Sequence, residues 1–282
     1  MSKENKKKIS FQGAHGAYSD IACREVFPGL ETIPCNTFEE AFAACQNGDA
    51  DLAMIPVDNT LAGRVADVHH FLPRSGLSII GEHFLKIEHA LLGVKGATIG
   101  GLKHVHSHLH ALPQCRKIIK ELGLTPHVHA DTAGAAGEVA ERGDKEHAAI
   151  ASKLAAEIYG LEVLRGDVQD ADHNTTRFII LSKTPSVPAY EADKTYVTSF
   201  TFTVRNIPAA LYKAMGGFAT NGVNMVKLES YMNPQFQSTS FYADVVDHAE
   251  SDALKLAFAE LEFFAEELNV LGSYPAHPFR KL

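Results

Sequence analysis

The chain has 282 residues, of which 45% are hydrophobic and 21% charged, and its formal net charge is −8. This length exceeds the needs of one compact domain and predicts two, and the composition is that of an ordinary soluble globular protein. The acidic balance argues against a general nucleic-acid binder, and an anionic ligand would need specific cations inside a site.

The cysteines and the amino-terminal segment indicate a cellular compartment. The four cysteines form no C-x-x-C pair, which is typical of small buried thiols in a reducing cytoplasm. The basic start, MSKENKKKIS, is followed by no long apolar run, so neither a signal peptide nor a transmembrane helix is expected. We therefore expect a cytoplasmic protein with neither a membrane nor a nucleic acid as its partner.

The first half of the chain alternates strand and helix patterns. Short apolar runs predict strands at residues 9–12, 51–55, 77–80, 90–94 and 104–106, with Pro56 ending the second of them. Helical patterns lie at residues 16–27, 41–47, 65–72, 109–122, 132–142 and 152–159, the second of them after a Thr37–Glu40 capping box. This alternation predicts an α/β domain with a largely parallel sheet, whose ligands bind in loops beyond the carboxyl ends of strands.

The composition changes near residue 183. The segment SKTPSVPAYEADK carries two prolines and little apolar periodicity, which predicts a linker. Strands are then predicted at residues 196–204, 223–231, 240–246 and 270–274, and helices at residues 208–221 and 251–268. The order β-α-β-β-α-β is that of a ferredoxin-like module.

Two polar clusters follow predicted strands in the amino-terminal region. Residues 13–19 (GAHGAYS) place two glycines before a helix, where backbone N–H groups can approach an anion, although a tight turn is the commoner explanation. In residues 58–64 (DNTLAGR), Asn59 and Thr60 can either cap the next helix or bind a ligand. The residue types leave both alternatives open.

Histidines recur in a third cluster, residues 104–110 (HVHSHLH). Alternate histidines of a strand share one face, so a zinc site has to be considered. No thiolate or carboxylate joins them at ligand spacing, and the segment is expected to pass from strand to helix near Ser107. We therefore interpret Ser107 as a helix cap that can also hold a ligand, and we predict no metal.

The fourth cluster, residues 172–181 (DHNTTRFIIL), opens an apolar strand with hydroxyl groups and a guanidinium. Polar groups in such a place are costly unless each meets a partner. Neighbours on a strand face opposite sides, so one of Thr176 and Arg177 can face a cleft while the other meets a structural carboxylate. Spacing alone does not decide which of the two touches a ligand.

Together these clusters resemble the motifs of the prephenate dehydratase family. Residues 174–178 (NTTRF) match its N-x-T-R-F signature, and residues 13–19 match its G-x-x-G-A/T-F/Y-S motif. Residues 56–60 (PVDNT) resemble P-I/V-E-N-S, residues 107–112 (SHLHAL) resemble S-H-P-Q-A-L, and residues 131–133 (DTA) resemble S-T-A. The motifs occur in the family's order and cover nearly the whole chain.

This resemblance implies a fold and a reaction. The fold is a catalytic domain at residues 8–183, with two α/β lobes like those of periplasmic binding proteins and a cleft between them. A linker at residues 184–195 then leads to an ACT regulatory domain at residues 196–282, with an α+β ferredoxin-like fold. The reaction is the conversion of prephenate to phenylpyruvate, with loss of carbon dioxide and water, in phenylalanine biosynthesis. No cofactor and no metal is implied.

The resemblance also implies roles for individual residues. Thr176 would give a hydrogen bond or a proton to the leaving hydroxyl group, and Arg177 would hold a substrate carboxylate or order the mouth of the strand. Phe178 is expected in the core beneath Thr176, and His108 is as readily structural as substrate-binding. The substrate-binding residues implied are Gly13, Gly16, Ser19, Asn59, Thr60, Ser107, His108, Thr132, Asn174, Thr175 and Phe178.

The second module resembles ACT domains, which in this family bind phenylalanine and inhibit the enzyme. Residues 208–212 (PAALY) stand where the family has P-G-A-L, residues 222–225 (GVNM) match G-V/I-N, and residues 228–230 (LES) match the start of E-S-R-P. Tyr231 and Met232 replace Arg-Pro, which leaves the identity and strength of the effector open. The effector-binding residues implied are Ala209, Ala210, Leu211, Asn224, Glu229 and Ser230.

Two other functions stay open at this level. One is an arogenate dehydratase, whose substrate differs from prephenate in one substituent. The other is a non-catalytic protein that binds or senses a small molecule on the same fold. Because ACT-type modules usually pair, the resemblance also implies a homodimer or a homotetramer.

Overall fold

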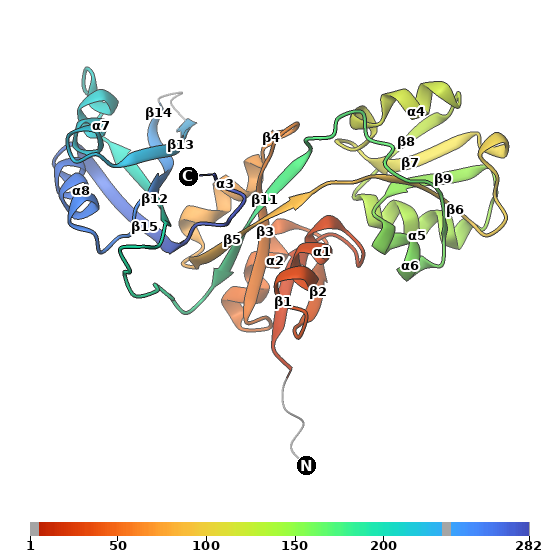
Figure 1. Cartoon of the computed structure of the whole chain (residues 1–282), viewed down its shortest axis with the longest axis horizontal. Helices are drawn as coiled ribbons and strands as arrows, with labels where there is room; N and C mark the ends of the chain where they lie inside the picture. Colours follow the sequence, from red (N-terminus) through yellow and green to blue (C-terminus); the bar gives the residue numbers. More distant parts are fainter. Residues whose placement is uncertain (1–5, 233–237, 282) are drawn as a thin grey trace, which may run out of the picture. The chain divides into compact units, whose positions relative to one another are not determined.

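The computed structural model describes residues 6–232 and 238–281 (Figure 1). Contacts divide the chain into two compact units. The first unit consists of Met1–Val68 and His83–Phe178, and the second unit consists of His69–Glu82 and Ile179–Leu282. No helix in the described ranges is long and apolar enough to cross a membrane.

The first lobe is built on a sheet with the strand order β2-β1-β3-β11-β5, to which the short β4 adds beside β3. Its strands are β1 (Lys8–Gln12), β2 (Glu31–Cys35), β3 (Leu52–Asn59), β4 (Gly63–Arg64), β5 (Ser78–Lys86) and β11 (Thr175–Ser182). Its helices are α1 (Tyr18–Val26), α2 (Phe38–Asn47) and α3 (Ala66–Phe71), followed by the 3-10 turn η1 (Leu72–Arg74). Since β1, β2 and β3 run parallel, the loops after them share one edge of the sheet.

Local sequence explains two features of this lobe. The predicted capping box is confirmed, because Thr37 Oγ1 accepts the Glu40 N–H at 3.1 Å and Glu40 Oε2 accepts the Asn36 N–H at 2.8 Å. The predicted end of a strand at Pro56 is wrong, because β3 continues past it. The pairing of β1 with β3 reaches only Met54, so the missing N–H of Pro56 removes no bond to that neighbour.

The second lobe is built on a sheet with the strand order β10-β6-β9-β7-β8. Its strands are β6 (Ala90–Gly93), β7 (His104–His108), β8 (Thr125–His129), β9 (His147–Ala151) and β10 (Glu162–Arg165). Its helices and turns are η2 (Ile99–Gly101), η3 (Leu112–Gln114), α4 (Arg116–Glu121), α5 (Thr132–Arg142) and α6 (Lys153–Tyr159). The pairs β7–β8 and β7–β9 are parallel, whereas β6–β9 and β10–β6 are antiparallel. The expected parallel arrangement therefore holds for only part of this sheet, which lies between α4 on one side and α5 and α6 on the other (Figure 1).

Two predictions for this lobe are wrong. The helix expected over residues 109–122 is replaced by η3 and the short α4, because Pro113 lacks an N–H and restricts the residue before it. Ser107 is not a helix cap, because it lies inside β7 and its Oγ donates to the Ile150 carbonyl at 2.6 Å. By contrast, α5 and α6 lie where the pattern predicts them, and Asp131 and Ser152 cap their first turns.

The second unit contains the predicted ferredoxin-like module. Its elements are β12 (Tyr196–Val204), α7 (Ala210–Thr220), β13 (Asn224–Met232), β14 (Ser238–Val246), α8 (Asp252–Phe264) and β15 (Ala265–Pro275). The antiparallel sheet has the order β13-β14-β12-β15, and its core stacks Phe200 on Phe218, with Phe258 edge-on to both. The helix predicted to reach residue 268 ends at Phe264 instead, where β15 takes over.

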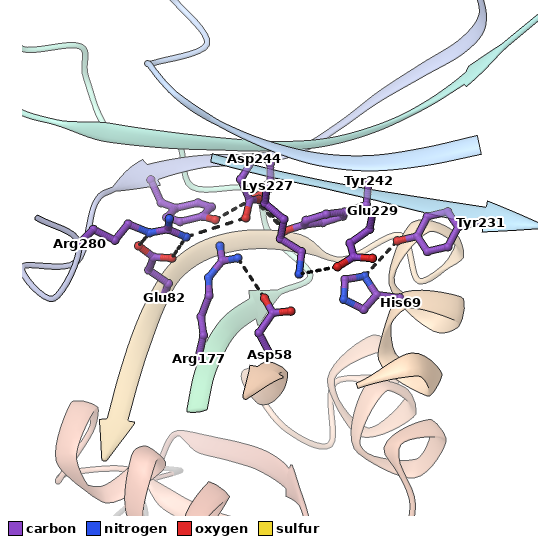
Figure 2. Close-up of polar contacts among 12 residues, drawn as sticks. Asp58, His69, Glu82, Arg177, Lys227, Glu229, Tyr231, Tyr242, Asp244 and Arg280 are labelled. Carbon is purple, nitrogen blue, oxygen red and sulfur yellow. Dashed lines mark hydrogen bonds and ion pairs between the residues drawn. The ribbon is translucent and has the colours of Figure 1, made fainter. Parts of the chain in front are cut away.

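A buried polar cluster lies within the second unit (Figure 2). Glu82 of β5 accepts hydrogen bonds from Arg280 Nε at 2.7 Å and from Arg280 Nη2 at 3.0 Å. Arg280 Nη2 also lies 3.9 Å from Asp244 Oδ2, while Asp244 Oδ1 accepts the Tyr242 hydroxyl at 2.7 Å. We call Glu82, Tyr242, Asp244 and Arg280 the anchor cluster. Its two carboxylates are fully buried, so their charge has to be supported by such donors.

Candidate active site

A cavity of about 610 Å³ lies in the first unit and is lined by both lobes. The first lobe contributes Gly13 after β1, Ser19 of α1, and Asn59 at the end of β3. The second lobe contributes His108 at the end of β7 and Thr132 at the start of α5. Loops beyond strand ends therefore form this cavity, where α/β folds place their ligands.

Eight of the residues predicted for the site line this cavity. They are Gly13, Ser19, Asn59, His108, Thr132, Asn174, Thr176 and Phe178. The five others proposed for the catalytic domain lie outside the lining among the described residues: Gly16, Thr60, Ser107, Thr175 and Arg177. The motifs therefore lead to this cavity, and those of their residues that do not line it contact the segments around it.

The supporting residues make contacts that are visible in the structure. Thr60 Oγ1 donates to the His173 carbonyl at 2.8 Å and accepts the Thr175 N–H at 2.9 Å, which joins the loop after β3 to the start of β11. The Gly16 carbonyl accepts the Ser152 hydroxyl of the second lobe at 2.6 Å. Gly16 has φ +86°, and a Cβ there would lie 2.8 Å from Ala155 Cα. This close approach of the two lobes therefore requires glycine.

Thr176 and Arg177 face different partners. Thr176 lines the cavity. The guanidinium of Arg177 is buried, with Nη1 3.6 Å from Asp58 Oδ2 (Figure 2). The alternation expected from the sequence is therefore present, with the threonine toward the cleft and the arginine toward a carboxylate of the protein.

A chain of hydrogen bonds leads to the Thr176 hydroxyl group. Asn59 Oδ1 accepts the N–H groups of Leu61 and Ala62, at 2.9 and 2.8 Å, which fixes the orientation of the amide. Its Nδ2 therefore donates both hydrogens, to Asn174 Oδ1 at 2.8 Å and to Thr176 Oγ1 at 2.9 Å. No acceptor among the described residues takes the Thr176 hydrogen. The hydroxyl group can thus donate into the cavity.

The same chain continues beyond Asn174. Asn174 Nδ2 donates to Gln114 Oε1 at 2.7 Å, and His89 Nε2 lies 3.3 Å from the same oxygen. An amide oxygen only accepts, so Nε2 carries the imidazole hydrogen and Nδ1 accepts. The Tyr18 hydroxyl has one hydrogen and shares it between two acceptors, His89 Nδ1 at 2.7 Å and the Glu88 carbonyl at 2.9 Å. Burial raises the pKa of Tyr18 well above its usual value, which keeps it a donor.

The sequence interpretation did not select Tyr18, His89 or Gln114 for the site. Tyr18 belongs to the GAHGAYS motif, but His89 follows β5 in a segment without a recognised pattern, and Gln114 lies where a helix was expected. Burial lowers the pKa of His89 to about 4, so its imidazole is neutral at pH 7. Every group in this chain of hydrogen bonds, from Tyr18 to Thr176, is therefore uncharged.

The histidine cluster beside this cavity forms pairs. His104 Nδ1 lies 3.1 Å from His127 Nε2, and His106 Nε2 lies 2.8 Å from His147 Nδ1. Burial, followed by the charge of His127, lowers the pKa of His106 to about 4. No group of three or more potential ligands in the described part of the chain is arranged to hold a metal ion. The imidazoles therefore act as hydrogen-bond partners of one another.

The residues implied for effector binding all lie in the second unit. Ala209 precedes α7 with φ +61°, Ala210 is buried, and Leu211 packs on the module's core. Asn224 begins β13, and further along that strand Glu229 Oε1 lies 3.7 Å from Lys227 Nζ. Ser230 lies opposite Phe241 of β14. The left-handed backbone at Ala209 explains why glycine is suited to this position.

Comparison with known proteins identifies relatives over the whole chain. A family model described as prephenate dehydratase matches residues 9–186. A bifunctional N-acyl-homoserine lactone acylase/prephenate dehydratase of Komagataeibacter europaeus is 52% identical over 274 residues, covering 97% of each chain. Arogenate dehydratase/prephenate dehydratase 2 of Arabidopsis thaliana is 35% identical over 285 residues, which are 98% of this chain and 74% of that one.

A solved structure shows the same fold. The prephenate dehydratase of Arthrobacter aurescens in complex with L-Phe matches with a TM-score of 0.86 and 28% identity, covering 96% of this chain and 92% of that one. The match extends over both units of this chain.

Proposed function

We propose how this cavity works from the premise that the chain belongs to the prephenate dehydratase family. Its activity is that of a hydro-lyase, which converts prephenate to phenylpyruvate, carbon dioxide and water. The ring carboxylate leaves as carbon dioxide, and its bonding electrons complete the aromatic ring. The ring hydroxyl group leaves from the opposite carbon and takes up a proton to become water. The step consumes one proton, and it needs a donor at the leaving oxygen.

Thr176 is that donor. Asn59 fills one lone pair of Thr176 Oγ1 at 2.9 Å, so the hydroxyl hydrogen points away from Asn59. This hydrogen bond from Asn59 is the observation on which the proposal rests. A threonine hydroxyl is a weak acid, so its contribution comes from a preformed hydrogen bond that strengthens as negative charge develops on the leaving oxygen.

Other lining residues provide sites for the two carboxylates of prephenate. Ser19 and Thr132 supply hydroxyl groups from opposite lobes, and burial lowers the pKa of His108, which keeps its imidazole neutral. Arg64 is the one lysine or arginine among the described lining residues. Arg177 orders the mouth of β11 through Asp58, while Thr60 and Thr175 hold the loop that follows Asn59.

Replacing Thr176 by Ala tests this assignment. We expect turnover of prephenate to fall by about 100-fold or more, because a positioned proton donor is lost. The melting temperature should stay close to that of the wild type, because the change removes little buried volume beside a cavity. Turnover like that of the wild type would contradict the role of Thr176, whereas absence of product from the wild type would contradict the reaction itself.

The substrate can be prephenate or its amino analogue arogenate, and the Arabidopsis relative is named for both. We propose prephenate as the preferred substrate, because the matching family model is that of prephenate dehydratases. Competition of the two substrates in one assay gives the ratio of their kcat/KM values. A ratio that favours arogenate would overturn this preference.

A second activity is proposed from the Komagataeibacter relative, which is also named an N-acyl-homoserine lactone acylase and is 52% identical. In this reaction water would cleave the amide bond of an N-acyl-homoserine lactone, which gives a fatty acid and homoserine lactone. We expect release of homoserine lactone above that of heat-denatured protein. No release would restrict the chain to the dehydratase reaction.

Regulation is proposed to involve L-phenylalanine bound to the second unit. The supporting observation is the Arthrobacter structure in complex with L-Phe, whose match covers 96% of this chain. The chain is further proposed to form a homodimer or homotetramer. Calorimetry with L-phenylalanine tests the effector, and the absence of binding heat would contradict it. Light scattering tests the assembly, and a monomer at micromolar concentration would contradict it.

A further inference from the structure

We propose that Gln114 is a positioning residue, which joins the second lobe to the Thr176 hydroxyl group through its side-chain oxygen. The inference deepens the proposed function and rests on it, since it assigns a task within the same cavity. Gln114 ends η3 and lines the cavity. Its Oε1 accepts from Asn174 at 2.7 Å, and it lies 3.3 Å from His89 Nε2.

Gln114 differs from the other residues of the hydrogen-bond chain in its place in the fold. His89 lies in the crossover from β5 to β6, and Asn174 ends the crossover from β10 back to β11. The two crossovers are bonded to each other, because the Ile87 N–H donates to the Asn174 carbonyl at 2.8 Å and the Val168 N–H donates to the His89 carbonyl at 2.9 Å. Gln114 is thus the member that the second lobe supplies.

This arrangement makes the hydroxyl direction depend on the distance between the lobes. With Gln114 in place, both hydrogen bonds to its oxygen are made, and Asn174 presents Oδ1 to Asn59. If the second lobe moves away, the Asn174 amide loses its acceptor and is free to rotate. Asn59 then loses one of its two acceptors, so only the Leu61 and Ala62 N–H groups at its oxygen still hold the amide that directs Thr176, and that contact becomes less rigid.

Gln114 acts in these contacts only as a hydrogen-bond acceptor. Gln114 uses its oxygen toward both neighbours, and the amide nitrogen takes no part in the chain. Glutamate has the same length and keeps an acceptor at that position, whereas methionine has a similar shape and loses it. The pair of variants therefore separates the hydrogen bond from packing.

The test compares Gln114→Met and Gln114→Glu with the wild type for kcat, KM and melting temperature. We expect Met to lower kcat by at least about tenfold, because a misplaced catalytic group costs between one and two orders of magnitude. We expect Glu to keep kcat within about threefold while raising KM, because a carboxylate in the cavity repels a dianionic substrate. Gln46→Met on α2, outside the cavity lining, serves as the control for the exchange itself.

A double-mutant cycle with Thr176→Ala shows whether Gln114 acts through Thr176. If it does, Gln114→Met lowers kcat in the wild-type background but hardly lowers it further in the Thr176→Ala protein. Equal losses in both backgrounds would assign Gln114 a structural task and overturn the proposal, as would equal kcat values for the Met and Glu variants. Thr176→Ala alone reports separately on the proposed function.

Discussion

The hydrogen-bond chain of the cavity and the anchor cluster of the second unit are both buried and polar, but they differ in charge. The chain from Tyr18 to Thr176 consists of hydroxyl, amide and neutral imidazole groups. The anchor cluster places the Arg280 guanidinium between two buried carboxylates. Each amide in this series has one donor end and one acceptor end, so a series of amides can orient one hydrogen. The Arg280–Glu82 pair adds charge attraction to its two hydrogen bonds, so it suits the fastening of one segment to another.

The largest effect is expected from breaking the anchor cluster. Arg280→Ala leaves the fully buried Glu82 carboxylate without the two hydrogen bonds it now accepts from that side chain. The expected loss is about 3–5 kcal/mol of the free energy of unfolding, the usual cost of removing one partner of a buried ion pair. Urea denaturation measures it, with exposed Lys281→Ala as the neighbouring control. A change below about 0.5 kcal/mol, as for an ordinary surface residue, would contradict the role of Arg280.

The next effect comes from reversing the direction of the cavity chain. Asn59→Asp keeps the acceptor for the Leu61 and Ala62 N–H groups but replaces the donor nitrogen by an oxygen. The Thr176 hydroxyl should then donate to the new carboxylate instead of to the substrate. We expect kcat to fall by about 100-fold or more, with stability changed far less than by Arg280→Ala. Full activity of this variant would show that the orientation of Thr176 does not matter.

Acid should act through the histidines of the first unit. The pKa values of His89 and His106 are lowered to about 4 by burial, from an ordinary value of about 6.5. Between these values the unfolded chain binds more protons than the folded one, so the free energy of unfolding falls as the pH drops from about 6.5 to about 4. Melting temperatures across this range measure the loss. His106→Gln should flatten the curve, and an unchanged slope would contradict the assignment.

The smallest effect is expected from relieving backbone strain at Ala209, which lies in the second unit outside the anchor cluster. Ala209 holds φ +61°, a region that costs a residue with a Cβ about 1 kcal/mol. Ala209→Gly should therefore raise the free energy of unfolding by up to about 1 kcal/mol, whereas Ala214→Gly inside α7 should lower it by about that amount or more. Equal destabilisation by both changes would show that the backbone at Ala209 is not strained.

The sequence was sufficient where local chemistry determines the structure. The Thr37 capping box, the first turns of α5 and α6, and the β-α-β-β-α-β order of the module all follow from short patterns. Strands β2, β8 and β10 were not predicted, because they are partly exposed and carry prolines or charges. β9 was missed although it is almost wholly buried, because its alanine-rich run HAAIA has weak strand preference.

The candidate site was predictable in its motifs but not in its connections. Asn59, Asn174 and Thr176 stand in segments that resemble family signatures, and the structure brings them within hydrogen-bonding distance. His89 comes from a segment without a recognised pattern and Gln114 from one that was expected to be helical, and both reach the site only because the two lobes and their crossovers meet there. Such contacts depend on tertiary structure, which spacing along the chain does not encode.

The most direct test of the account compares Thr176→Val with Thr176→Ser in single-turnover measurements with prephenate. Valine keeps the shape of threonine without the hydroxyl group, and serine keeps the hydroxyl group. We expect the Ser variant to retain the rate of phenylpyruvate formation within about tenfold, and the Val variant to lose about 100-fold or more at an unchanged melting temperature. A Val variant that turns over prephenate as fast as the Ser variant would contradict the claim that Thr176 donates to the leaving oxygen.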